Sequence, residues 1–265
     1  MITKENIEQY IDKIPPAPKV VQETVKLLQQ GELVRAANVA KEDLALSSYL
    51  RNLVNKPIYG FTNEIKDIGQ IFGILGVSRS LQTVYNYLLN ILSPDNWEFF
   101  KLTKSNFEMF QAELSTSWSK ILEYLNVEDK EIESAVTLLP ASIVVCEALF
   151  KEHKKDVELI RATKDMDLNI ILQRLSGYSL FDICEMIAQK WEMDLKIIKL
   201  VKASSGKEID IEEEILEYAK WMHLLLFYIL SKPHCIEAGL NDFLEFNVEF
   251  IEDIYEEFSK VMGLE

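Results

Sequence analysis

Residues 81–94 read LQTVYNYLLNILSP, and the spacing of their apolar side chains decides the fold class. These side chains recur every three or four residues, at Leu81, Val84, Tyr85, Leu88, Leu89 and Leu92. That period puts them on one face of an α-helix, which ends near Pro94 because proline has no backbone N–H for the helical hydrogen bond. Other periodic segments have the same spacing, and no run of alternating β-branched residues lies between hairpin turns. The sequence therefore predicts an all-α fold.

Shorter stripes of the same kind precede this helix. One runs from Ile68 to Leu75 and stops at Gly76, where a residue in the left-handed conformation would cap the helix. Two earlier stripes cover residues 20–28 and 46–54. We expect roughly five short helices within residues 1–92.

The tripeptide Ser93-Pro94-Asp95 is the best candidate for a domain boundary, because it joins a helix breaker to two residues that favour turns and caps. Residues 1–93 are then expected to form an N-terminal helical bundle, and residues 94–265 a second helical domain packed against it. The first helices of that second domain are expected over residues 107–125, 131–150, 159–175, 180–191 and 195–202.

Two C-terminal helices are expected after the turn Ser204-Ser205-Gly206. Asp210 and Glu213 have the spacing of a capping box, which predicts a helix whose apolar face continues to Ile229. The last helix, over residues 243–261, carries an aromatic stripe. Its other faces hold Glu245, Glu249, Glu252, Asp253, Glu256 and Glu257. A solvated acidic face over an aromatic core is favoured here over a docking site for a basic partner.

The composition is that of a folded acidic protein. Lys and Arg number 28 against 43 Asp and Glu, which gives a net charge of −15, while 48% of the residues are hydrophobic. That apolar share offsets chain entropy, as a disordered acidic tail cannot. A field of negative sign repels nucleic acids and anionic lipids, so neither nucleic acid nor membrane is an expected partner.

The chain also lacks targeting features. Its N-terminus has neither the basic start nor the apolar run of a signal peptide. The most apolar stretch, residues 135–150, contains Pro140 and falls short of the roughly 20 residues that cross a bilayer, so we expect a buried core helix. Cys146, Cys184 and Cys235 are odd in number and widely separated, which is typical of buried, reduced thiols. The expected location is the cytoplasm.

Four segments in the first half resemble the HDOD domain family, in the order that the family has them. Ile14-Pro15-Pro16-Ala17-Pro18 resembles its opening Leu-Pro-Pro-x-Pro. Asp43-Leu44-Ala45-Leu46-Ser47 resembles its Asp-Pro-x-Leu-Thr, with Leu44 in place of the usual proline. Asn55-Lys56-Pro57-Ile58-Tyr59-Gly60 resembles Asn-Ser-x-x-Tyr-Gly, and Ile68 to Gly76 resembles Ile-x-x-Ala-x-x-x-Leu-Gly. The similarity extends to about Ser205, and it implies a multi-helical fold.

These markers have a structural interpretation, which we favour. Asn55 can hydrogen-bond a helix end, Tyr59 offers apolar area with a hydroxyl, and Gly60 permits a turn. A ligand site at Asn55 and Tyr59 is the alternative.

In its second half, the HDOD family resembles a degenerate HD phosphohydrolase. Where the family has Leu-Leu-His-Asp or Leu-Leu-His-Asn, this chain has Leu138-Leu139-Pro140-Ala141. Where the family has Trp-x-Leu-Pro and then two adjacent histidines, it has Trp191-Glu192-Met193-Asp194 and then Ser204-Ser205. Leu180 stands near a further family histidine. Hydroxyl groups do not replace imidazoles on a divalent metal, so we predict no metal ligands at these positions.

The histidine count supports the same prediction. An HD centre needs two histidines and two aspartates, with one His-Asp pair, and this chain has only His153, His223 and His234, none followed by Asp. We interpret His153 as a solvated surface residue and His223 as a core histidine. His234 and Cys235 are expected in a loop, where they could bind metal only with distant partners. We therefore predict no catalytic residue, no cofactor-binding residue and no cofactor, and other catalytic motifs are missing too.

The HDOD resemblance implies bacterial signal transduction, often beside cyclic-dinucleotide or phosphotransfer components and sometimes linked to motility. The favoured hypothesis is a non-catalytic regulatory module that acts in trans on a protein partner, because no receiver or cyclase domain accompanies it. A second hypothesis is a small-molecule or nucleotide sensor that uses the vestigial HD pocket near Ser204 and Ser205. A metal-dependent phosphohydrolase with a rearranged carboxylate centre is the third. The sequence predicts neither the partner nor the oligomeric state.

Overall fold

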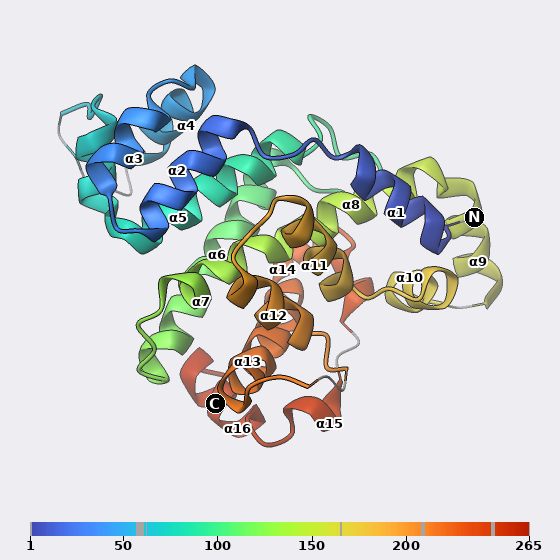
Figure 1. The fold of residues 1–265 in the computed structure, drawn as a ribbon. Coiled ribbons are helices and arrows are strands. Elements are labelled where there is room, and N and C mark those ends of the chain that lie inside the picture. The colour runs from blue at the N-terminus through green and yellow to red at the C-terminus, as the bar shows by residue number, and fades with distance from the viewer. Residues whose placement is uncertain are drawn as a thin grey trace. The chain divides into compact units, whose positions relative to one another are not determined.

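The computed structural model describes residues 2–56, 61, 63–164, 166–207, 210–244 and 247–264. Every regular element within those ranges is a helix, which confirms the predicted all-α class (Figure 1). The chain divides into two compact units. The smaller unit contains Pro16–Ile91 and Asp129–Ser134, and the larger unit contains Met1–Pro15, Leu92–Glu128 and Ala135–Glu265. The two units thus interleave along the sequence, while a domain boundary at residues 93 and 94 stays a prediction.

The smaller unit is built from three whole helices and most of two more. The whole helices are α2 (Lys19–Gln29), α3 (Leu33–Ala40) and α4 (Leu44–Val54), and the other two are α5 (Ile68–Leu92) and α7 (Lys130–Ala135). Helix α4 begins after Asp43, whose carboxylate accepts hydrogen bonds from the backbone N–H groups of Ala45 and Leu46, each at 2.9 Å. Tyr49 of α4 packs against Tyr87 of α5, with ring centroids 5.5 Å apart. The apolar faces predicted from the sequence are buried, as Leu46 and Leu50 of α4 and Val84 and Leu89 of α5 show.

Gly76 interrupts α5 with φ 71° and ψ −179°. The sequence predicted a positive φ at this glycine, as the cap of a helix that ended there. The positive φ is confirmed, but the helix continues beyond the glycine after a kink. A side chain on this residue would be strained, because that region of backbone conformation is almost restricted to glycine.

The larger unit contains the remaining helices. They are α1 (Lys4–Lys13), α6 (Lys104–Tyr124), η2 (Val136–Leu138), α8 (Leu139–Glu152), α9 (Lys154–Lys164), α10 (Leu168–Ser176), α11 (Leu180–Lys190), α12 (Leu195–Ala203), α13 (Glu213–Leu230), α14 (Pro233–Glu237), η3 (Leu240–Phe243), α15 (Val248–Ile251) and α16 (Tyr255–Met262). Helix α8 is buried along nearly its whole length and packs against α1, α9 and α11. These helices enclose an aromatic core, in which the following side chains are fully buried: Trp118, Trp221, Phe110, Phe150, Phe181, Phe243 and Phe258.

The apolar segment that includes α8 is a core element, as predicted. Among the described residues, one helical stretch is long and apolar enough to span a membrane. It is Lys130–Glu152, with a mean hydropathy of 1.7. However, 89% of its apolar window is buried inside the protein. The sequence predicted one helix over residues 131–150, whereas the structure inserts the 3-10 turn η2. Pro140 explains the interruption, because it has no N–H to bond the carbonyl four residues earlier.

Two other predicted helices are wrong in their extent. The helix expected over residues 159–175 is divided into α9 and α10, because Asp167 begins a new helix by accepting a hydrogen bond from the backbone N–H of Ile170 at 2.8 Å. The capping box expected at Asp210 and Glu213 does not form. Helix α13 begins after Glu212 without a side-chain cap, and the Glu212 carboxylate pairs with Lys199 at 2.6 Å.

The long C-terminal helix expected over residues 243–261 is also wrong. The structure has η3, α15 and α16 instead, because Asn247 caps α15 by accepting from the backbone N–H of Phe250 at 3.2 Å. Glu245 and Phe246 lie outside the described residues. The predicted division of surfaces is confirmed for most of the rest. Phe243, Ile254 and Phe258 are buried and Phe250 and Val261 are half-buried, whereas Glu249, Glu252, Asp253, Glu256 and Glu257 are exposed.

Candidate functional site

The first position where the HD superfamily places metal ligands is filled by core packing. Leu138, Leu139, Pro140 and Ala141 lie at the junction of η2 and α8, and all four are buried. The thiol of Cys184 on α11 donates to the carbonyl oxygen of Leu138, at 3.3 Å. Apolar side chains and a neutral thiol thus occupy this junction, and they supply no hard oxygen or imidazole ligand for a divalent metal.

The second position lies where α12 ends. Ser204 is fully buried, and its hydroxyl donates to the carbonyl oxygen of Leu200 at 2.8 Å, which leaves it facing its own helix. Ser205 and Gly206 then form the predicted turn, with φ 71° at Gly206. A side chain at Gly206 would crowd Asn247 and Phe250, because its Cβ would lie 3.2 Å from an atom of each.

His223 of α13 links this turn to the C-terminal segment. Its Nδ1 lies 2.8 Å from the carbonyl oxygen of Ser204, and its Nε2 accepts a hydrogen bond from the backbone N–H of Asn247 at 3.0 Å. These partners require a neutral ring with the proton on Nδ1. Burial lowers the pKa of His223 to about 4, against the smaller opposing effect of its hydrogen bond to Ser204. The interpretation of His223 as a satisfied core histidine is confirmed.

A cavity of about 410 Å³ opens beside this histidine, within the larger unit. Its walls come from α10, the start of α11, the turn after α12, α13 and the segment at Asn247. The lining residues are Asn169, Gln173, Gly177, Ser179, Leu180, Phe181, Ser205, Gly206, Lys207, His223, Phe227 and Asn247. Two of them, Leu180 and Ser205, stand at or beside positions where the family resemblance implies histidines. The cavity therefore adjoins positions where the resemblance implies metal-binding histidines.

An ion pair lies at the rim of this cavity. The ammonium group of Lys207 contacts both carboxylate oxygens of Asp182, each at 2.7 Å. Asp182 also accepts from the backbone N–H and the hydroxyl of Ser179, at 2.6 and 2.7 Å, which completes a capping box at the start of α11. The cation that lines the cavity is thus already neutralised by a fixed carboxylate.

The other histidines lie apart from this cavity. His153 ends α8 and is half-buried, so the prediction of a solvated surface residue is only partly right. His234 lies in the short helix α14 and not in a loop, with its Nε2 3.9 Å from Oε2 of Glu113. No group of three or more His, Cys, Asp or Glu side chains with the spacing of a metal site occurs in the described parts of the chain. The donor set does not fit the metal centre of the HD superfamily.

All three cysteines are free and buried. Burial raises the pKa of the Cys146 thiol, and it raises the pKa of both Cys184 and Cys235 to about 12. They are buried core residues, as the sequence predicted, and these raised pKa values keep them protonated near neutral pH. Protonated thiols are inert, because only the thiolate is reactive.

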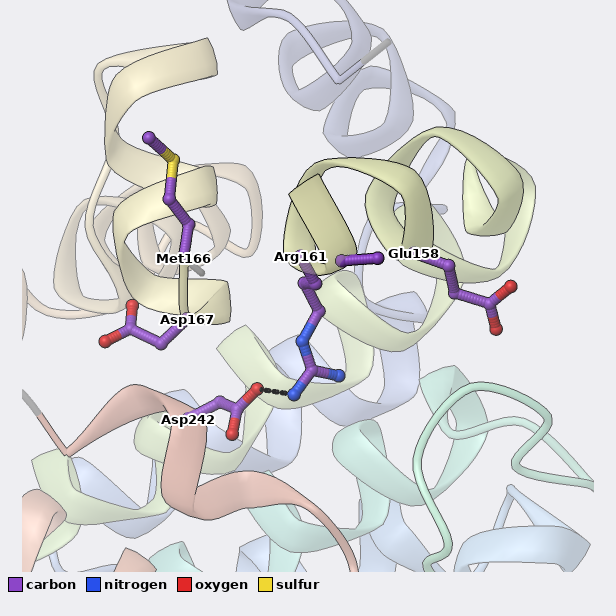
Figure 2. Close-up of a pocket in the computed structure, with 6 residues that line it drawn as sticks. Glu158, Arg161, Met166, Asp167 and Asp242 are labelled. Carbon is purple, nitrogen blue, oxygen red and sulfur yellow. Dashed lines mark ion pairs between the residues drawn. The ribbon is translucent and has the colours of Figure 1, made fainter. Parts of the chain in front are cut away.

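A second hollow, of about 530 Å³, lies between α9, the start of α10 and η3. Figure 2 shows Arg161 of α9 reaching across it to form an ion pair with Asp242, while Glu158 points away from that pair. Burial raises the pKa of Asp242, Arg161 opposes that shift, and Asp167 adds to it. An internal ion pair thus spans the hollow, with Asp167 close enough to Asp242 to act on its pKa.

In the smaller unit, Asn55 has the structural role that the sequence suggested. Its side-chain amide donates to the carbonyl oxygens of Arg51 and Ile65, each at 2.9 Å, and its oxygen accepts from the backbone N–H of Ile65 at 2.8 Å. It thereby ties the end of α4 to the segment before α5. Tyr59 and Gly60 lie outside the described residues, so the alternative of a ligand site with Tyr59 stays a hypothesis.

Sequence reasoning missed most of the cavity wall. Asn169, Gln173, Lys207 and Asn247 come from separate elements, and their spacing along the chain forms no motif. The available signals were Ser205, which the resemblance had placed at the mouth of the vestigial pocket, and Leu180, which it had placed near a family histidine.

Comparisons with known proteins match this architecture. A structure described as an HDOD domain protein of unknown function from Geobacter sulfurreducens aligns with a TM-score of 0.66 at 13% identity, over 98% of this chain and 95% of that one. A "Putative phosphohydrolase" from Shewanella amazonensis aligns with a TM-score of 0.63 at 14% identity, over 97% and 95%. A "Putative signal transduction protein" from Marinobacter aquaeolei aligns with a TM-score of 0.64 at 15% identity, over 97% of this chain but 60% of that one.

These likenesses, at such low identity, show the fold. No curated protein sequence matches the chain. The family is shown by a different comparison, in which the model of the HDOD domain matches residues 14–206. That match includes both positions where the HD superfamily has its metal ligands, and it covers more than half of the sequence. The chain belongs to the HDOD domain family.

Proposed function

We propose that this protein is a non-catalytic regulatory module of bacterial signal transduction, which acts in trans through contacts with a protein partner in the cytoplasm. One observation carries the proposal. The positions of the HD metal ligands hold Pro140, Ala141, Ser204 and Ser205. Pro140, Ala141 and Ser204 are buried, and they serve the packing of the helices. What the chain retains of an HD protein is its helical body.

The family supports the regulatory part of the proposal. An HDOD resemblance implies signal transduction, which is often linked to cyclic-dinucleotide components and sometimes to motility. One protein with a similar fold is named a "Putative signal transduction protein". The charge of the chain supports a protein partner in preference to nucleic acid or membrane, because its net charge of −15 repels both.

Two measurements test this proposal. Purified protein, incubated with Mn²⁺ or Mg²⁺ and with nucleoside monophosphates or a cyclic dinucleotide, is expected to show no turnover above the buffer and no stoichiometric metal. Tagged protein at its native level is expected to retain a protein partner, and the complex should re-form from the two purified components. Turnover that disappears in His223→Gln or Asp242→Asn would overturn the proposal, and so would failure of every retained protein to bind after purification.

A sensor of small molecules is the second candidate, and the cavity of about 410 Å³ favours it. Cavities of several hundred Å³ that are mostly preformed are the usual binding sites of small ligands. A ligand that binds the folded state alone raises the melting temperature, so a thermal-shift screen tests this candidate.

A further inference from the structure

The cavity beside His223 has walls that restrict what it can bind. We infer that it takes a small uncharged molecule that presents one hydrogen-bond donor and one acceptor beside an apolar body, and that it discriminates against phosphates. This inference rests on the second proposed function, the sensor, and it names the ligand class.

The charges of the wall argue against an anion. Among the described lining residues, Lys207 carries a charge and His223 is neutral. The ammonium group of Lys207 is already bound by both carboxylate oxygens of Asp182, each at 2.7 Å. Asp182 is mostly buried, with 15% of its side chain exposed, and Ser179 fixes it in place. If Lys207 turned toward a phosphate, the carboxylate would lose its counter-charge next to a second anion. The net charge of −15 adds to that repulsion.

The hydrogen-bonding groups of the wall are mostly engaged already. His223 uses both ring nitrogens, and Asn247 bonds the backbone of Gly206 and Phe250. Gln173 and Ser205 are two groups that keep capacity. Gln173 donates from its amide nitrogen to Asn169 at 3.1 Å, which leaves its carbonyl oxygen as an acceptor. The Ser205 hydroxyl accepts from the backbone N–H of Lys207 at 3.4 Å and can still donate. A matching ligand offers one donor and one acceptor.

Part of the remaining wall is apolar. Leu180, Phe181 and Phe227 are each at most 7% exposed, and they line the same cavity. An apolar or aromatic ligand body gains free energy against such a wall in proportion to the area that it buries. Amides, lactams and uncharged heterocycles combine this body with the required donor and acceptor.

The test compares matched pairs of molecules that differ only by a phosphate. Adenosine, guanosine, cytidine and uridine are uncharged and present donors and acceptors on a flat ring, and their 5′-monophosphates are the counterparts. Binding is measured by ligand-observed NMR and by thermal shift on the full chain. Gln173→Trp fills the cavity from the exposed face of α10. Arg174→Trp is the matched control, because Arg174 is the exposed neighbour outside the lining.

We expect at least one nucleoside to bind at least about tenfold more tightly than its monophosphate. Gln173→Trp should weaken that binding by at least about tenfold, while Arg174→Trp should leave it unchanged. If the monophosphates bind more tightly and Gln173→Trp abolishes their binding, the ligand class is overturned and the sensor function stands. If no molecule of either set binds in a manner sensitive to Gln173→Trp, the inference and the sensor function both fail, and the proposal of a protein partner is unaffected.

Discussion

Nδ1 of His223 donates a hydrogen bond to the carbonyl oxygen of Ser204 over 2.8 Å, and Ser204 stands where the family resemblance places the first of two adjacent histidines. The nearest imidazole thus approaches the vestigial position from another helix, α13, and it bonds the backbone there. Its second nitrogen bonds Asn247, so the neutral ring joins the end of α12 to the start of α15. Hydrogen bonds through one histidine of α13 thus hold together the end of α12 and the start of α15.

The first prediction concerns pH. Burial lowers the pKa of His223 from its ordinary value of 6.5 to about 4 in the folded protein. Between these values the unfolded chain binds a proton that the folded chain does not. The free energy of unfolding should therefore decrease as the pH falls from 6.5 to 4, by a contribution on the order of 3 kcal/mol. Urea unfolding at a series of pH values measures it.

Carboxylates also titrate in this range, so the comparison needs a variant. His223→Gln removes the titrating ring, and its free energy of unfolding should depend less steeply on pH between 4 and 6.5. Parallel curves for the two proteins would show that His223 does not contribute.

The second prediction concerns a buried carboxylate in α8. Glu147 is 1% exposed, and it accepts three hydrogen bonds of 2.6 to 2.9 Å from the backbone N–H groups of Glu98, Phe99 and Phe100. Glu147→Ala would leave three buried donors without an acceptor, so we expect a loss of at least about 3 kcal/mol in the free energy of unfolding. Glu152→Ala, at an exposed position of the same helix, should change it by less than about 0.5 kcal/mol. Equal losses in both variants would contradict this role for Glu147.

The third prediction uses two glycines of α5. Gly76→Ala should destabilise the protein by about 1–3 kcal/mol, because φ 71° with ψ −179° strains any residue with a Cβ atom. Gly73→Ala should stabilise it by about 0.5–1 kcal/mol, because Gly73 is helical and exposed, and an added Cβ meets no atom within 4 Å. Thermal unfolding of the two variants should thus shift in opposite directions. A shift of the same sign in both would rule out the kink as the cause.

The fourth prediction concerns the position where the chain departs from the HDOD pattern. Leu44 is the first residue of α4 and is 83% exposed, and Asp43 before it has the extended conformation that precedes proline readily. We expect Leu44→Pro to raise the free energy of unfolding by about 0.4–1 kcal/mol. Ala45→Pro is the matched control and should lower it, since the N–H of Ala45 bonds the Asp43 side chain. A destabilised Leu44→Pro protein would mean that Leu44 makes a contact of its own.

The helices that the sequence predicted well have strong local signals. Helix α4 begins at an Asp43 cap and has a regular apolar stripe, and α11 begins at a Ser179 cap and ends near Trp191. The errors fall where two local signals compete. Apolar spacing continues across Asp167 and across Asn247, but in each case the side chain caps a new helix and ends the previous periodicity. Periodicity alone does not reveal which of the two prevails.

The candidate site divides in the same way. The loss of metal-binding side chains could be predicted from the sequence, at Pro140, Ala141, Ser204 and Ser205. The cavity cannot be read from it, because Asn169 and Asn247 line one cavity only after the helices between them have folded. Nor could the role of His223 be read in detail, since both of its partners are backbone groups, whose positions leave no trace in residue identity.

The buried thiols of Cys146, Cys184 and Cys235 have a practical consequence. Their high pKa values and their burial keep all three out of reach of alkylating reagents while the chain is folded. Labelling can begin only when a helix that carries one of them opens, and each label adds a known mass. The rate at which each cysteine is alkylated, followed by mass spectrometry, therefore reports how often its helix opens, without any engineered probe.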